Sequence, residues 1–110
     1  MLEELNTIVE RTGLPVETGV FSGTAPDAYV VITPISEHFG LFSDDGPGMN
    51  IEEARLSLYS KKNYTQKKDL LVRMLLTAGF TVSDRQYIGH EADTGYHHYS
   101  IDLAQEREEI

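Results

Sequence analysis

The sequence contains no cysteine and no tryptophan, and basic residues are scarce. Without cysteine the chain cannot form disulfides, use a thiol nucleophile or bind zinc through thiolates. Nine lysines and arginines oppose eighteen acidic residues, for a net charge of −9. That balance argues against specific nucleic-acid binding, because neutralising phosphates requires a basic surface.

Long apolar runs are also missing. No stretch approaches the roughly 18 apolar residues that a membrane-spanning helix needs, so we expect no membrane partner. The first residues, MLEELNTIVE, are acidic and amphipathic, whereas a signal peptide begins with basic residues. These absences predict an intracellular, soluble protein.

The remaining composition suits one hydrophobic core. The chain has 110 residues, of which 40% are hydrophobic, as in a single globular domain. We expect residues 1–110 to form that domain, with 105–110 as a frayed acidic tail.

Hydrophobic periodicity predicts two helices. In residues 2–12 the apolar side chains fall on one helical stripe, and Gly13 ends the helix. In residues 65–78 a second apolar stripe runs up to Gly79, which we expect to cap the helix.

Alternating or β-branched residues predict the strands. The segment 28–33 (AYVVIT) is rich in β-branched and aromatic residues and is closed by Pro34. Residues 51–60 alternate apolar with polar side chains and most simply pair antiparallel with 28–33. Shorter or weaker strands are predicted at 16–21, 80–88 and 96–103.

The resulting order, α-β-β-β-α-β-β, indicates an α+β fold. We expect a single, largely antiparallel β-sheet of four to five strands with both helices packed on one face. A long loop, residues 35–50, separates the second and third strands.

That 35–50 loop has an unusual composition. Sixteen residues without regular structure are long for a compact domain, and several of them are apolar. Either these side chains fold back onto the core, or the segment is an arm that packs on another chain. The second interpretation makes its apolar and acidic residues candidate interface residues: Phe39, Leu41, Phe42, Asp44, Asp45 and Met49.

The negative charge is unevenly distributed. Residues 55–73 contain six of the nine bases and one acid, a charge of +5, which leaves −14 for the rest. Three interpretations stay open: a solvated turn, a small nucleic-acid contact, or docking onto the acidic surface of a partner or identical neighbour. The docking interpretation adds four candidate interface residues: Lys61, Lys62, Lys67 and Lys68.

Candidate chemistry is sparse. The pair His97-His98 lies on a predicted strand, where neighbouring side chains point to opposite faces and cannot easily share a metal. We expect one histidine to pack across strands and the other to be exposed; a metal site with residues of the 90–93 turn is the alternative. The Asp44-Asp45-Gly46 run does not fit the register of a calcium loop. We therefore expect no metal, no cofactor, no catalytic residues and no enzymatic activity.

Beyond these patterns, most of the chain from Leu14 to Leu103 resembles small tail-completion proteins of long-tailed phages and prophages, the tail-terminator or head–tail joining family. The segments that carry the resemblance are LPVETGVFSGTAPDAYVVITP, PISEHFG, EARLSLYSKKNYTQKKDLL and YIGHEADTGYHHYSIDL. The last is the most distinctive, while the N-terminal helix matches weakly. These are structural patterns, and none is a catalytic motif.

The resemblance implies a structural phage morphogenesis protein. Such proteins cap the head-proximal end of the tail tube as a ring, typically a hexamer, and help join tail to head. The implied partners are other copies of the chain, a tail-tube protein and a head–tail connector protein, with a monomer as the free form. DNA would pass through the ring, and the protein would move from the bacterial cytoplasm into the virion. Another neck or minor tail component, or an acidic protein-binding module acting through residues 35–50, is the alternative.

Overall fold

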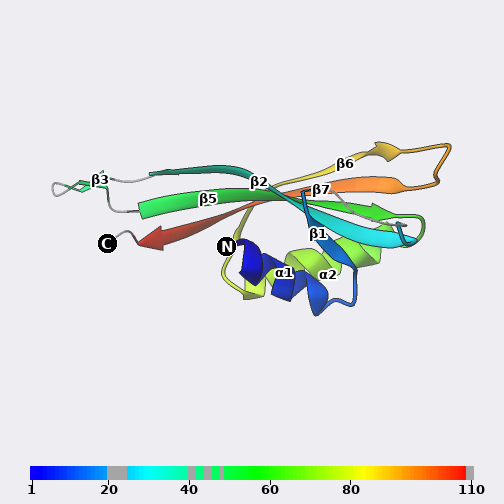
Figure 1. Ribbon diagram of the computed structural model, residues 1–110, viewed down its shortest axis with the longest axis horizontal. Helices are drawn as coiled ribbons and strands as arrows, with labels where there is room; N and C mark the ends of the chain where they lie inside the picture. Colours follow the sequence, from blue (N-terminus) through cyan, green and yellow to red (C-terminus); the bar gives the residue numbers. More distant parts are fainter. Residues whose placement is uncertain (20–24, 40–41, 44–45, 48, 109–110) are drawn as a thin grey trace.

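The computed structural model describes residues 1–19, 25–39, 42–43, 46–47 and 49–108. Its main element is a five-stranded sheet of order β1-β2-β5-β7-β6 (Figure 1). The strands are β1 (Val16–Thr18), β2 (Ala28–Phe39), β5 (Met49–Ser60), β6 (Thr81–His90) and β7 (His97–Glu108). All neighbours are antiparallel except β1 and β2, which run parallel. The predicted α+β fold is confirmed, with a mixed sheet in place of a purely antiparallel one.

Both helices cover the same face of the sheet, as the sequence predicts. Helix α1 spans Leu2–Glu10 and α2 spans Tyr64–Thr77, and Figure 1 shows the two side by side below the strands. The core lies between these layers, and its buried members come from both helices and alternate positions of the strands: Leu5, Ile8, Val9, Val30, Ile32, Ala54, Leu56, Leu58, Leu71, Val72, Leu75, Phe80, Ile101 and Leu103.

Pro34 does not close the second strand. Strand β2 continues to Phe39, and its register with β5 shifts between Pro34 and Ser36, which marks a bulge. Proline lacks an N–H and is therefore tolerated in strands at bulges and edges. Here β1 pairs with β2 only as far as Ile32. Pro34 lies beyond that pairing, so β1 requires no hydrogen bond from it.

The prediction of an irregular loop over 35–50 is consequently wrong. Residues 35–39 belong to β2, and two short strands, β3 (Phe42–Ser43) and β4 (Gly46–Pro47), pair with each other before β5 begins at Met49. The predicted antiparallel pairing of 28–33 with 51–60 is confirmed, and the hairpin between them is longer than predicted.

The C-terminal segment also differs from the prediction of a frayed tail. Strand β7 runs through Gln105 to Glu108 and pairs there with the beginning of β5. The Gln105 side chain donates a hydrogen bond from Nε2 to Glu4 Oε2 of α1 at 2.9 Å. Strands β5 and β7 each have twelve residues and pair along their whole length. This pairing therefore extends β7 through the acidic residues that suggest a tail.

Helix α2 begins after a strained residue. Asn63 has φ of +54° and makes no side-chain capping bond. We expect Asn63→Ala to lower the free energy of unfolding by about 1–2 kcal/mol, because an alanine Cβ is disfavoured in the left-handed region. The control Asn63→Gly should change it far less, since glycine adopts this conformation readily. Urea unfolding followed by circular dichroism measures both; equal losses in the two variants would contradict the backbone explanation.

Candidate protein-interaction surfaces

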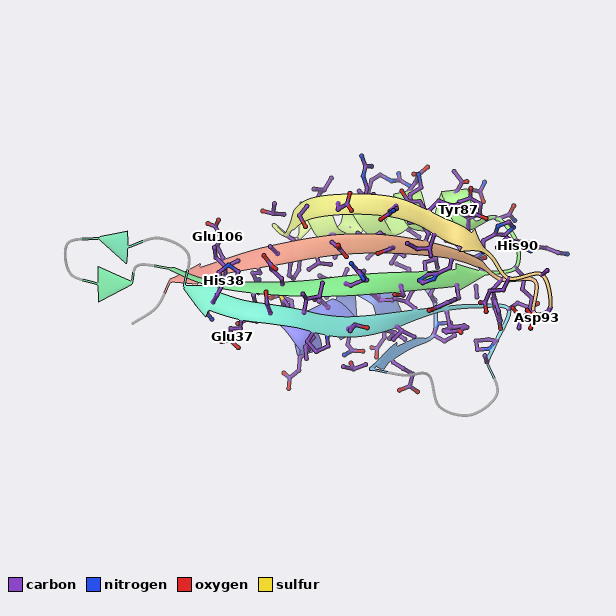
Figure 2. The ribbon with its side chains drawn as sticks, turned by 90° about the horizontal axis from the view of Figure 1, so that it is seen from above. Glu37, His38, Tyr87, His90, Asp93 and Glu106 are labelled. Carbon is purple, nitrogen blue, oxygen red and sulfur yellow. The ribbon has the colours of Figure 1, made fainter. Side chains whose placement is uncertain are left out.

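The molecule is elongated, with principal extents of 54 × 25 × 24 Å. Its two ends carry different chemistry, as Figure 2 shows from above the sheet. Glu37, His38 and Glu106 lie at one end, whereas Tyr87, His90 and Asp93 lie at the other. The twelve-residue strands β2, β5 and β7 connect these two ends.

The first end is an acidic extension of the sheet, here called the arm: residues 37–39, 49–52 and the β3–β4 ribbon, flanked by the last residues of β7. Figure 1 shows it reaching past the start of α1. At its base, Asn50 Nδ2 donates to Glu37 Oε1 at 3.0 Å, and the N-terminal amino group lies 3.7 Å from Glu52 Oε2. Residues 37–52 contain four acids and no lysine or arginine. The arm is therefore strongly negative.

Six of the candidate interface residues belong to this hairpin. Phe39 and Met49 stand at the ends of β2 and β5, and Phe42 belongs to β3. Leu41, Asp44 and Asp45 lie outside the described residues. The three described residues, Phe39, Phe42 and Met49, thus belong to the paired strands of one projecting hairpin.

The lysine cluster, Lys61, Lys62, Lys67 and Lys68, lies at the opposite end, where β5 leads into α2. Lys67 Nζ donates to the Lys62 carbonyl at 2.8 Å, which brings these two together. Lys61 and Lys68 are directed elsewhere: Lys61 Nζ lies 3.7 Å from Asp27 and 5.1 Å from the centre of the Tyr96 ring. Lys68 Nζ lies 2.9 Å from Asp69 and 5.4 Å from the Tyr99 ring. Two of the four lysines therefore already hold acidic partners.

An aromatic stack on the uncovered face escaped the sequence analysis. Tyr29 and Tyr59 stack with ring centres 4.9 Å apart, and Tyr59 stacks on His98 at 4.3 Å. Tyr96 meets both tyrosines edge-on, at 5.5 and 6.3 Å. Burial raises the pKa of Tyr29 and of Tyr59 above the usual tyrosine value. Tyr29, Tyr59 and His98 are direct partners across β2, β5 and β7. Finding this stack from the sequence would have required the register of all three strands.

His97 and His98 lie on opposite faces, as predicted. On the helix-covered face, His97 packs against Tyr64 at 5.0 Å and His90 at 4.6 Å, and its Nδ1 lies 2.9 Å from the Tyr87 hydroxyl. The expectation that one histidine would be exposed is wrong, because both are half-buried in aromatic surroundings. Within the described ranges, no three histidine, aspartate or glutamate residues come together to hold a metal ion.

His98 makes a pH-dependent contribution to stability. Burial lowers its pKa below 6.5, opposed by Glu91 and reinforced by Arg55, and its buried Nε2 finds no hydrogen-bond partner among the described residues. The unfolded chain therefore binds a proton at a pH where the folded protein does not, so stability is lost as the pH falls below about 6.5.

We expect His98→Phe, which keeps a ring against Tyr59, to flatten this pH dependence. Chemical unfolding of both proteins between pH 7.5 and pH 5 measures the free energy of unfolding at each pH. The contributions of the other titrating groups cancel when the two proteins are compared. An identical pH dependence in the variant would show that His98 is not responsible.

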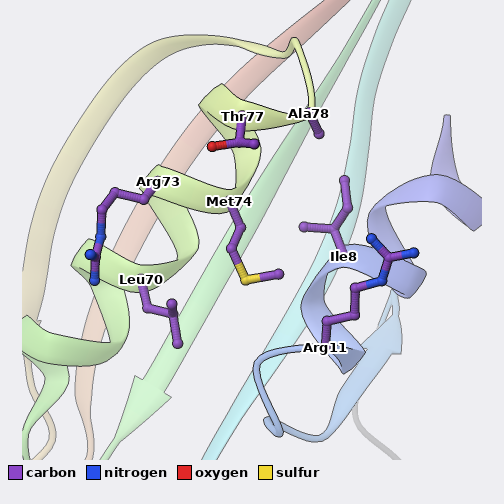
Figure 3. A pocket seen from close by; sticks show the side chains of 7 residues that line it. All are labelled: Ile8, Arg11, Leu70, Arg73, Met74, Thr77 and Ala78. Carbon is purple, nitrogen blue, oxygen red and sulfur yellow. The ribbon is translucent and has the colours of Figure 1, made fainter.

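A groove separates the two helices (Figure 3). It has a volume of about 550 Å³ and apolar walls, with Ile8 from α1 facing Leu70 and Met74 from α2. Two arginines, Arg11 of α1 and Arg73 of α2, stand at its sides. In the part of the chain that the structure describes, neither guanidinium group forms an ion pair with a carboxylate. Sequence analysis missed this groove because it depends on how α1 and α2 are spaced on the sheet.

No protein-family model matches the chain, and no curated protein matches it. Among the residues described here, neither helix is long and apolar enough to cross a membrane.

Proposed function

We propose that this protein is a non-enzymatic structural subunit of the tail-terminator type, which caps the head-proximal end of a phage or prophage tail tube and helps join the tail to the head. One observation carries the proposal: the subunit is an elongated sheet with an acidic arm at one end and a lysine cluster at the other. The resemblance of residues 14–103 to tail-completion proteins supports the same function.

This polarity suits assembly from identical subunits. When one patch of a subunit contacts a different patch of its neighbour, the contact is heterologous and closes into a ring if the rotation permits. Complementary charges at the two patches fix the orientation of such a contact. In addition, from Thr33 to Phe39 the outer edge of β2 has no strand partner within the described ranges, which leaves backbone groups available to a neighbour.

Capping a tube in this way requires complementary shape and charge, and it requires no catalysed reaction. The ring would contact the last ring of tube subunits on one side and the connector on the other. The excess of acidic residues outside the lysine cluster suits a lumen that DNA crosses without being held, since like charges repel. A ring whose lumen is basic would contradict this part of the proposal.

Tube assembly in the presence of the protein tests the function. Tail-tube subunits from the same phage or prophage should polymerise into long tubes alone and into tubes with one blocked end when the protein is added. Electron microscopy of tubes seeded with labelled subunits shows how many ends still grow. Continued growth at both ends, with no protein bound to the tubes, would refute the proposal, and bovine serum albumin at the same concentration is the control.

A further inference from the structure

The groove between α1 and α2 has the chemistry of a docking site for an apolar, acidic segment. Its walls offer Ile8, Leu70 and Met74, and methionine adapts its shape readily to an inserted side chain. Arg11 and Arg73 add two positive charges at its sides. Arg73 makes one weak bond, from Nε to the Asp69 carbonyl at 3.4 Å, which leaves its charge uncompensated by that contact. A segment that fits must therefore bring large apolar side chains and carboxylates.

The tip of the arm, residues 39–49, has that composition. Its sequence, FGLFSDDGPGM, combines two phenylalanines, a leucine and a methionine with two adjacent aspartates. No lysine or arginine interrupts it. A segment with this many large apolar residues between two strands is more typical of an interaction site than of a solvated turn.

The tip cannot reach the groove of its own chain. Backbone pairing holds β2 against β5 as far as Phe39 and Asn50, and β5 against β7 as far as Met49 and Glu108. These three paired strands direct the hairpin away from the helices, past the start of α1 (Figure 1). An occupant with the chemistry of the tip must therefore come from a second molecule.

We infer that the arm tip of one copy docks into the inter-helix groove of the next, with its aspartates near Arg11 and Arg73 and its apolar side chains against Met74. Each copy contributes one tip and one groove at different places, so the contact runs head to tail and closes into a ring or continues as a chain. This inference rests on the proposed function and places the neighbour's contact with the acidic arm at Arg11 and Arg73 of the groove instead of at the lysine cluster.

Disulfide trapping tests the contact on the full-length chain, which has no cysteine of its own. A Phe42→Cys chain and a Met74→Cys chain are mixed and oxidised mildly, and mixed dimers are counted by mass spectrometry. The matched control replaces Met74→Cys by Ile88→Cys, a cysteine at an exposed position of β6 outside the groove. We expect mixed dimers well above the Ile88→Cys background, and a yield equal to that background would overturn the inference.

Charge reversal then tests the pairing. Arg11→Glu with Arg73→Glu in the Met74→Cys chain should lower the yield of mixed dimer by at least roughly tenfold, because like charges at an interface strongly disfavour contact. Asp44→Lys with Asp45→Lys in the Phe42→Cys chain should restore it. A yield that the reversal leaves unchanged, or that the second pair does not restore, overturns the inference. Since trapping needs no tail tube, such a result leaves the capping function to be judged by the tube experiment.

Discussion

Replacing residues 40–48 by a glycine–serine linker of equal length should abolish self-association and leave the fold intact. The linker removes the apolar and acidic side chains of the tip while the paired strands on both sides keep their register. The hydrophobic core that the described residues form lies between the two helices and the interior of the sheet, so the free energy of unfolding should change little. Sedimentation velocity over a range of concentrations measures association, and thermal unfolding measures stability.

A substitution at the opposite end of the sheet tests whether the effect is specific to the arm. The turn 91–94 joins β6 to β7 at the opposite end of the sheet, and an Asp93→Ser substitution there removes one acid from that end. This variant should associate as the original protein does. If the tip variant associates normally as well, the arm is not an assembly surface.

The largest effect on stability is expected in helix α2, where two adjacent leucines have opposite environments. Leu75 is 0% exposed and belongs to the core, whereas Leu76 is 55% exposed. Leu75→Ala should lower the free energy of unfolding by about 2–5 kcal/mol, because it removes buried methyl groups and leaves a cavity. Leu76→Ala removes the same atoms at the surface and should change it by no more than about 0.5 kcal/mol.

Urea unfolding of the two variants measures this contrast. For a chain of this size the loss in Leu75→Ala is a large part of the total, which is typically about 5–15 kcal/mol. Similar losses in both variants would mean that α2 does not pack on the sheet in the way described.

Local sequence patterns were sufficient for the fold class because they reflect burial directly. The 65–78 stripe and Gly79 predicted α2 to within one residue at each end, and Gly79 has the positive φ of a helix cap. The alternation in 51–60 likewise placed the interior of β5 correctly. In each case the side chains that repeat with the period of the element are those that the core buries.

The prediction was wrong where pairing between distant segments overrides local composition. Pro34 and the glycines after it favour a loop, yet β2 continues because β5 lies beside it along its whole length. The acidic end of β7 reads as a tail, yet it is held by the same partner strand. Both errors concern the arm, where sequence analysis named candidate interface residues and missed the strands on which Phe39, Phe42 and Met49 lie.

The candidate surfaces differ in the same way: some are set by local sequence and others by contacts between distant segments. The lysine cluster and the arm tip are contiguous in the sequence and were found from composition alone. The Tyr29–Tyr59–His98 stack and the inter-helix groove each combine residues from segments far apart in the chain. Such sites depend on register and helix spacing, which no single segment encodes.

Electron microscopy of the purified protein at high concentration is the most direct measurement of its assembly. We expect closed rings of identical subunits with a lumen wide enough for duplex DNA, in which the arm of each subunit contacts its neighbour. A preparation that contains only single subunits at every concentration, and that also leaves the ends of tail tubes bare, would contradict the proposed role in tail completion.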